Sequence, residues 1–247
     1  MPAFRCADTI TRAIDSALRQ EVEVEIIVVN DASPEDLDAV MATYAQDERV
    51  RYVKNPVNLG AAASRNKGVE LAQGEYVAFL DADDCWREGK LLHQITLMEQ
   101  EDVVLSSTAR ELMSSDGEPT GHIIPVKSSL KYKDLLRHNP IACSSVVLRT
   151  EVAREFPMEH EDSHEDYIAW MRILKKYQKA VGVNEPYLLY QYSNTGKSGS
   201  KGKSAKMTFR AYRYMGFGYV KSMLCFVAYA FHGVWKYSKL QNIVRKH

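Results

Sequence analysis

Buried strands and helices alternate along the first hundred residues, and this alternation constrains the fold more than any other feature of the chain. The predicted strands cover residues 24–29, 50–53, 75–80 and 102–107. The predicted helices cover residues 9–20, 60–71 and 87–100, with one more that opens at Ser33 as N-cap, followed by Pro34 and Asp36. This order predicts an α/β domain with a mostly parallel sheet flanked by helices.

The pattern is less regular after residue 107. Asp116-Gly117 predicts a turn between two short strands, and residues 142–148 and 187–192 predict two more strands. Residues 165–176 predict a helix. Its expected inner face consists of Tyr167, Trp170, Met171 and Leu174. Residues 193–204 have the composition of a flexible loop.

Acidic residues stand where two of the predicted strands end. Asp81 and Asp83 follow residues 75–80, and in an extended segment residues two apart point the same way. Their carboxylates suit Mg²⁺ or Mn²⁺, although a solvated acidic loop is the alternative. Asp31 ends another strand and reaches the same crevice, where ligands of such sheets bind, or it forms an Asx turn.

Three further side chains are ambiguous from the residues alone. Asp166 opens a helix three residues after Ser163, so it forms a capping box or acts as a catalytic carboxylate. The surrounding residues 160–166 (HEDSHED) resemble a metal cluster but lack a standard ligand spacing. Arg65 lies near a glycine-led helix start, where it either contacts phosphates or remains on the surface.

These pieces occur together in an order that resembles the family-2 glycosyltransferases, which are inverting enzymes with the GT-A fold. The resemblance covers about residues 2–195. It rests on residues 2–4 (PAF), 14–18 (IDSAL), 28–33 (VVNDAS), 55–60 (NPVNLG), 65–68 (RNKG), 74–84 (GEYVAFLDADD) and Glu165-Asp166. The tail from Lys203 to Tyr237 resembles members that build bacterial capsule, O-antigen or teichuronic-acid chains.

The resemblance implies a role for each of five residues. Asp31 would hold the nucleotide base, usually uracil, and Asp81 would lie near the ribose. Asp83 would bind a divalent cation, Mg²⁺ or Mn²⁺, on the diphosphate, and Arg65 would assist at the nucleotide. Asp166 would be the general base that deprotonates the acceptor hydroxyl, so that direct displacement inverts the anomeric centre.

The sequence departs from the family pattern at its start. A strand of roughly six residues normally precedes the segment that matches Pro2 to Phe4, and here this first strand is apparently missing. An upstream start is the expectation, and a truncated product is the alternative. Phe4-Arg5 also replaces a common Tyr-Asn pair, which affects the expected stacking on the base.

The formal net charge of zero hides two unlike parts. Residues 1–185 carry a net charge of −11 and the last 62 residues carry +11, with no acidic residue after Glu185. Overall neutrality argues against a general nucleic-acid binder. Ten of the 24 aromatic residues lie at or after Phe209, and aromatics beside cations are typical of a helix at an anionic membrane surface. A helix packed on the domain and a single membrane span are the alternatives.

The expected organisation is a glycosyltransferase domain over residues 1–195, with a nucleotide-binding half (1–107), an acceptor half (108–195) and a basic, aromatic helical tail (196–247). The expected activity is the transfer of a sugar from a nucleotide sugar to a glycan or lipid-linked glycan of the cell surface. The expected donor is linked to UDP. The expected location is cytoplasmic, peripheral at the inner face of the membrane. An inactive partner in a polysaccharide assembly complex and a sugar nucleotidyltransferase are the alternatives.

Overall fold

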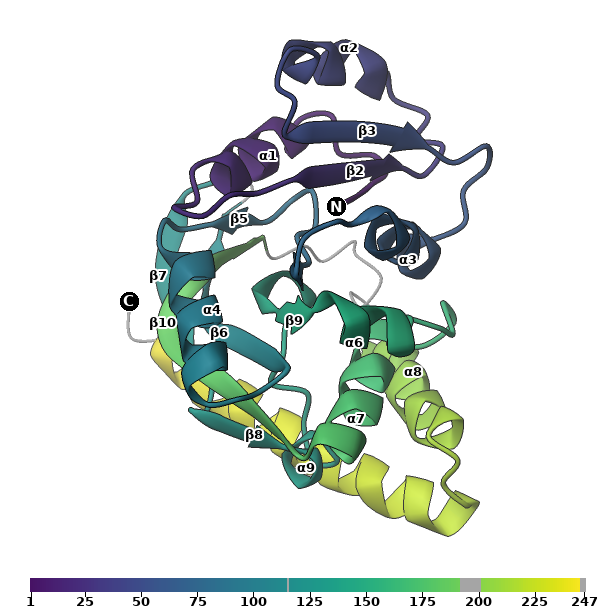
Figure 1. Cartoon of the computed structure of the whole chain (residues 1–247). Helices are drawn as coiled ribbons and strands as arrows, with labels where there is room; N and C mark the ends of the chain where they lie inside the picture. The colour runs from purple at the N-terminus through teal and green to yellow at the C-terminus, as the bar shows by residue number, and fades with distance from the viewer. Residues whose placement is uncertain (115, 192–200, 245–247) are drawn as a thin grey trace.

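The first of two sheets is small and entirely parallel. The computed structural model describes residues 1–114, 116–191 and 201–244, with side chains on the last helix as far as Phe231. The first sheet consists of β1 (Pro2–Ala3), β2 (Ile26–Asn30) and β3 (Val50–Lys54), in the order β1-β2-β3. Around it lie α1 (Ile10–Leu18), α2 (Leu37–Met41), the 3₁₀ turn η1 (Ala42–Tyr44) and α3 (Ala61–Leu71) (Figure 1).

The second sheet has seven strands and is mixed, so the prediction of a mostly parallel sheet is correct for the first sheet alone. Its central order is β4-β9-β6-β10-β5, with β7 on β6 and β8 on β10. Only β6 and β10 pair in parallel. The strands are β4 (Tyr76–Ala78), β5 (Cys85–Trp86), β6 (Leu105–Met113), β7 (Pro119–Ile124), β8 (Ser129–Lys131), β9 (Val147–Arg149) and β10 (Lys179–Gln191). Antiparallel hairpins need only short turns, and the predicted turn at Asp116-Gly117 joins β6 to β7.

Helices cover the second sheet and continue into the tail. They are α4 (Lys90–Gln100), α5 (Tyr132–Leu135), the 3₁₀ turn η2 (Cys143–Ser145), α6 (Thr150–Glu155), α7 (Glu165–Tyr177), α8 (Lys201–Tyr214) and α9 (Tyr219–Val244). The last two form a hairpin beside α7 (Figure 1). Residues 201–204 are therefore helical, which corrects their prediction as loop, and residues 193–200 of that prediction lie outside the described residues.

Two apolar clusters hold these layers together. One lies under the first sheet and contains buried side chains of α1, β2 and α4. The other lies under the second sheet, and residues of α7 and α8 pack within it. The predicted inner face of α7 is confirmed, because all four of its members are at most 1% exposed: Tyr167, Trp170, Met171 and Leu174. The first helix of the tail is thus built into the core under the second sheet.

Two local predictions were wrong in detail. The helix expected to open at Ser33 begins at Leu37, where the Asp36 side chain accepts a hydrogen bond from Ala39 N as the actual N-cap. Ser33 Oγ instead accepts from Arg5 N across the loop. The strand expected over residues 142–148 is interrupted, because Cys143–Ser145 form the η2 turn before β9 begins.

An apolar cavity of about 330 Å³ lies beside β2. Its lining includes Ile26 and Ile27 of β2 with side chains from α3, β4 and α4. The short strand β1 pairs with Val29 and Asn30, at the other end of β2. The strand that the family resemblance places before Pro2 stays a prediction.

Candidate active site

Helix α3 lies between the acidic residues that follow β2 and those that follow β4. Asn55 Nδ2 donates to Asp31 Oδ1 at 2.7 Å and to Ser64 Oγ of α3 at 3.0 Å. The next residue of α3, Arg65, forms an ion pair with Asp81. The two strand ends that the sequence predicted to share a crevice are therefore linked through one turn of α3.

The carboxylate of Asp31 organises the loop that leads into α3. It is 3% exposed and accepts hydrogen bonds from Asn55 Nδ2 (2.7 Å), Leu59 N (2.9 Å) and Gly60 N (2.8 Å). These three donors satisfy the hydrogen-bonding capacity of a buried polar group, which would otherwise be costly. Asp31 therefore fixes the loop that leads into α3, and its predicted contact with a nucleotide base stays a prediction.

Asp81, Asp83 and Asp84 lie in the short loop between β4 and β5. Ser144 Oγ of η2 accepts a hydrogen bond from Asp81 N at 3.1 Å, and Asp84 Oδ1 accepts from Gln191 N at 2.9 Å. Burial, followed by the charge of Asp81, raises the pKa of Asp83 and raises that of Asp84 well above its usual range. The loop thus holds like charges close together, an arrangement that a cation would stabilise.

The chemistry of this loop fits a divalent cation shared with a ligand. Within the described ranges no group of three or more His, Cys, Asp or Glu side chains has the geometry to hold a metal. Mg²⁺ commonly takes only one or two protein carboxylates and completes its shell with phosphate and water. Asp83 and Asp81 would supply those carboxylates, and a diphosphate would supply the rest.

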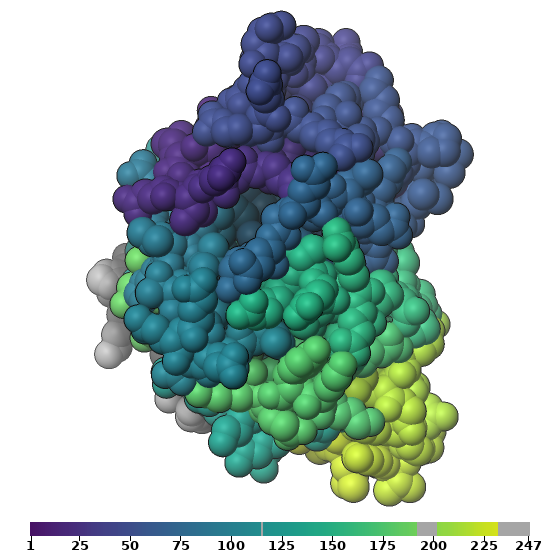
Figure 2. All heavy atoms as spheres, viewed as in Figure 1, coloured from purple at the N-terminus to yellow at the C-terminus, as the bar shows by residue number. Residues whose placement is uncertain are grey.

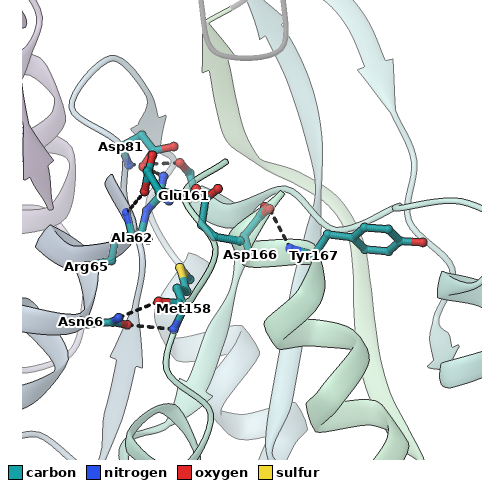
Figure 3. Close-up of polar contacts among 10 residues, drawn as sticks. Ala62, Arg65, Asn66, Asp81, Met158, Glu161, Asp166 and Tyr167 are labelled. Carbon is teal, nitrogen blue, oxygen red and sulfur yellow. Dashed lines mark hydrogen bonds and ion pairs between the residues drawn. The ribbon is translucent and has the colours of Figure 1, made fainter. Parts of the chain in front are cut away.

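Arg65 is buried and connects the two halves of the site. Its side chain is 7% exposed, so the alternative of a surface arginine is wrong. Nη2 lies 2.6 Å from Asp81 Oδ1, and Nη1 lies 3.0 Å from Glu165 Oε1 at the start of α7. Figure 3 shows Asp81, Arg65 and Asp166 grouped where α3 approaches α7. The guanidinium therefore fixes the position of the start of α7 relative to the acidic loop.

Asp166 is a carboxylate whose proton affinity suits a general base. Tyr167 N donates to its Oδ1 at 2.7 Å (Figure 3). Burial and the neighbouring charge of Glu165 raise the pKa of Asp166 to about 7, while Arg65 opposes the shift. A base with a pKa near the working pH is partly ionised and still basic enough to accept a proton.

The capping box that the sequence left as an alternative for Asp166 is not formed. His164 is the N-cap residue and makes no side-chain capping bond. Ser163 Oγ donates instead to Met207 O of α8 at 2.8 Å, so a tertiary partner replaces the local one. The Asp166 carboxylate is thus not engaged in the reciprocal cap that the sequence offered as an alternative to catalysis.

The loop before α7, residues 158–164, is held by α3 on one side. Asn66 Nδ2 donates to Met158 O at 2.7 Å, and Met158 N donates to Asn66 Oδ1 at 2.9 Å (Figure 3). Glu161 Oε2 accepts from Ala62 N at 2.9 Å, at the N-terminus of α3. Carboxylates are stabilised at helix N-termini, so Glu161 fastens this loop to the same helix that carries Arg65.

A substitution at Gly60 tests this attachment. Gly60 has φ +92°, and a Cβ there would lie 2.6 Å from Glu161 Cδ. We expect Gly60→Ala to lower the free energy of unfolding by about 1–3 kcal/mol, because it adds backbone strain and displaces Glu161. Gly121→Ala is the matched control, since Gly121 has φ +76° with nothing near its Cβ position. Equal losses in urea unfolding for the two variants would contradict the tight contact.

Sequence reasoning missed three residues that shape the site. Glu165 was visible only as the neighbour of Asp166, Glu161 as part of an acidic cluster, and Ser144 as part of a predicted strand. Their partners are remote in sequence, and Arg65 and Glu165 are 100 positions apart. The histidines of residues 160–166 also have separate partners: His160 stacks on Tyr214 at 3.6 Å, and His164 Nε2 lies 3.3 Å from Ser204 O.

The α/β fold brings an acidic loop, through Arg65, into contact with the start of α7, where Asp166 lies. Residues 1–155 match the family described as Glycosyl transferase family 2. The chain belongs to this family and is a glycosyltransferase, which confirms the resemblance drawn from its motifs.

Two curated relatives match nearly the whole chain. The putative teichuronic acid biosynthesis glycosyltransferase TuaG of Bacillus subtilis (strain 168) is 36% identical over 238 residues, 95% of this chain and 94% of that protein. The Escherichia coli protein named UDP-Glc:alpha-D-GlcNAc-diphosphoundecaprenol beta-1,3-glucosyltransferase WfaP is 31% identical over 236 residues, 95% of this chain and 92% of that one. Neither alternative function is favoured by these relatives.

Solved structures confirm the GT-A fold. Staphylococcus aureus TarS 1–349, in complex with UDP-GlcNAc, has a TM-score of 0.71 at 15% identity, covering 93% of this chain and 70% of that one. The mannosyltransferase PcManGT of Pyrobaculum calidifontis, in complex with GDP-Man and Mn²⁺, has a TM-score of 0.68 at 17% identity, covering 92% and 67%. At these identities the likeness concerns the fold.

Proposed function

We propose that this glycosyltransferase moves a sugar from a UDP-linked donor to a lipid-linked or growing surface glycan, with inversion of the anomeric centre. One observation carries the proposal. Arg65 joins the acidic loop, through Asp81, to Glu165 beside Asp166. Donor diphosphate and acceptor hydroxyl would then meet across one buried guanidinium.

The donor side of the site is assigned to the nucleotide-binding half, residues 1–107. Asp31 receives the base, Asp81 lies near the ribose, and Arg65 supports the nucleotide through Asp81. The names of WfaP, which specifies UDP-glucose, and of the TarS complex, which specifies UDP-GlcNAc, support a UDP-linked donor. GDP-Man in the PcManGT complex makes GDP-sugars the necessary comparison.

Asp83, with Asp81, is assigned the divalent cation. The raised pKa of Asp83 supports this, because it marks a carboxylate whose charge lacks sufficient compensation. A bound Mg²⁺ or Mn²⁺ would neutralise the departing diphosphate. Arg12, whose Nη2 lies 3.4 Å from Asp83 O, holds the loop from the side of α1 and adds positive charge nearby.

Asp166 acts on the acceptor side, in residues 108–195. It accepts the proton of the acceptor hydroxyl while that oxygen forms a bond to the anomeric carbon and the bond to the diphosphate breaks. A single displacement of this kind inverts the anomeric centre. The pKa of about 7 supports this role, since Asp166 is then able to hold and later release a proton near neutral pH.

The tail and the names of the relatives support the proposed acceptor and location. The name of WfaP specifies a diphosphoundecaprenol-linked acceptor and that of TuaG specifies teichuronic acid biosynthesis. A lipid-linked acceptor stays at a membrane, while sugar nucleotides are cytosolic. The enzyme therefore works as a peripheral protein on the cytoplasmic face, with residues 196–247 as its membrane-facing tail.

Asp83→Asn tests the donor site. For the wild-type protein we expect UDP with Mn²⁺ to raise the melting temperature by several degrees, because a ligand at a hundred times its Kd stabilises a protein by about 2.7 kcal/mol. Asp83→Asn should lose most of that shift, and Asp102→Asn, at an exposed aspartate at the end of α4, should retain it. If UDP with Mn²⁺ raises the melting temperature of Asp83→Asn as much as that of the wild type, Asp83 does not bind the cation.

A further inference from the structure

Helix α9 has one face packed on the domain. Ser222, Cys225, Phe226 and Tyr229 lie on this face at helical spacing, and the core of the acceptor half contacts the last three of them. Ser222 is fully buried. The Tyr229 ring lies 6.0 Å from Tyr167 of α7. The helix is therefore part of the folded domain, as one of the alternatives for the tail predicted.

The opposite face of α9 is also apolar, and it is exposed. This outer face consists of Val220, Met223, Leu224, Val227 and Phe231, spaced as one helical stripe. Their exposed fractions range from 37% for Met223 to 73% for Val220. With Tyr219, they make up six of the eleven exposed large hydrophobic residues among the described parts of the chain. Apolar side chains gathered in this way mark an interaction surface, whereas scattered ones do not.

The α8–α9 hairpin that carries the outer face has a positive net charge. Helices α8 and α9 contain no acidic residue, because the last one in the sequence is Glu185. Their cations are Lys201, Lys203, Lys206, Arg210, Arg213, Lys221, Lys236 and Lys239. Arg210 pairs with Asp162 on the domain, while Lys203, Lys206, Arg213 and Lys221 are exposed. The α8–α9 hairpin forms the lower right edge of the molecule in Figure 2.

Charge decides between two occupants of this face. A second copy of the chain would bring the same cations toward one another, and like charges oppose association. A membrane surface that contains anionic lipids can bury the apolar stripe between its headgroups and acyl chains. Its negative charge attracts the cations of the α8–α9 hairpin. No helix within the described residues has the length and apolar character to cross a bilayer.

We propose that the outer face of α9 lies in the interface of an anionic membrane, with Val220, Leu224, Val227 and Phe231 entering the boundary between headgroups and acyl chains. This inference rests on the proposed function, in that a lipid-linked acceptor requires the enzyme at a membrane. It goes beyond it by defining the contact surface as one stripe of a helix whose other face belongs to the core.

The same hairpin holds the loop before Asp166, which gives the contact a consequence for catalysis. Asp162 pairs with Arg210 of α8 at 2.9 Å, and Ser163 Oγ donates to Met207 O. His160 stacks on Tyr214 with ring centroids 3.6 Å apart. A membrane that fixes the hairpin therefore also fixes the height of the catalytic loop above the lipid, where the acceptor's sugar must arrive.

Flotation of the full chain with vesicles of phosphatidylglycerol and phosphatidylcholine tests the surface. We expect the wild type to float and the double variant Leu224→Gln/Val227→Gln to bind at least about tenfold less, since both side chains lose apolar burial. The matched control is Leu92→Gln/Ile123→Gln, at two exposed apolar positions on α4 and β7, which should bind as the wild type does. Vesicles of phosphatidylcholine alone should bind the wild type more weakly.

Two results would overturn the proposal. One is equal flotation of the α9 variant and the wild type. The other is a wild type that does not float but sediments as a dimer, which the α9 variant converts to a monomer. Release of UDP from UDP-sugars in detergent separates this outcome from the proposed function. Turnover without flotation refutes the membrane surface alone, and flotation without turnover of any nucleotide sugar refutes the proposed function alone.

Discussion

Asp166→Asn is expected to lower the rate of sugar transfer by about a thousandfold, within the range that a positioned general base contributes. The amide keeps the shape of the carboxylate and its hydrogen bond from Tyr167 N, but it does not accept the acceptor's proton. Donor binding should change little, because Arg65 contacts Glu165 and Asp81 and makes no hydrogen bond to Asp166. The measurement is the initial rate of product formation. The rise in melting temperature caused by UDP with Mn²⁺ is the control for donor binding.

The pH dependence distinguishes a base from a merely structural carboxylate. Burial and Glu165 raise the pKa of Asp166 from 3.8 to about 7, so the group is mostly protonated and inactive as a base below that pH. The wild-type rate should therefore rise as pH increases through about 7, and the residual rate of Asp166→Asn should not. A pH profile that is the same for both proteins would contradict the assignment.

The melting temperature of the Asp166→Asn variant checks that it folds. The raised pKa of Asp166 fixes the direction in which this temperature should change. A carboxyl whose folded pKa is raised contributes stability at low pH that is lost as pH rises through the folded value. At pH 8 the wild type has lost that contribution and the neutral amide has not. The variant should therefore melt at the same temperature as the wild type or higher.

Arg65→Met is expected to cause the largest loss of stability, about 3–5 kcal/mol, because it leaves a buried charge without compensation. The Glu165 side chain is 7% exposed, and its Oε1 lies 3.0 Å from Arg65 Nη1. Asp81 Oδ1 accepts a hydrogen bond from the other terminal nitrogen of Arg65, Nη2. Methionine fills similar volume, so the loss reports the missing charge more than a cavity. Urea unfolding followed by tryptophan fluorescence measures it.

The matched control is the double variant Arg65→Met/Glu165→Leu. Replacing both buried partners by apolar side chains removes the unpaired charge, so most of the lost stability should return. Sugar transfer should remain impaired, because nothing then joins the acidic loop to α7. Recovery of both stability and rate would show that the bridge is only a structural pair. An Arg65→Met variant as stable as the wild type would show that the Arg65–Glu165 pair does not contribute to stability.

Local patterns in the sequence predicted the elements that position the site. The helical spacing of Tyr167, Trp170, Met171 and Leu174 predicted the buried face of α7, and the acidic loop after residues 75–80 lies at a strand end as expected. Both depend on hydrophobic periodicity, which each segment carries in its own residues. The family resemblance added the predicted role of Asp166 as general base, which periodicity does not distinguish from a helix cap.

The two failed capping predictions share a physical cause, since a remote partner replaced the local one in each. Ser163 donates to Met207 O of α8 in place of capping α7. Ser33 accepts from Arg5 N, and the α2 helix begins only where Asp36 is available as a cap. The Arg65–Glu165 pair joins residues 100 positions apart, and no spacing rule within a single segment reports such a contact.

The tail shows the same limit on a larger scale. Its sequence is apolar on most sides of α9, so composition alone left a packed helix and an interfacial helix as competing predictions. The structure divides the helix into a face that contacts Tyr167 and a face that is exposed. The packed face is thus confirmed, and the membrane contact of the other face remains the proposal that flotation tests.

The anomeric configuration of the product tests the central claim most directly. The full-length protein, Mn²⁺, UDP-α-glucose and a synthetic GlcNAc-diphospholipid acceptor, chosen from the acceptor that the name of WfaP specifies, would be combined and the product analysed by proton NMR. Asp166 as the single base of a direct displacement predicts a β-linked glucose, formed about a thousandfold more slowly by Asp166→Asn. An α-linked product, or a β-linked product formed equally fast by that variant, would contradict the account.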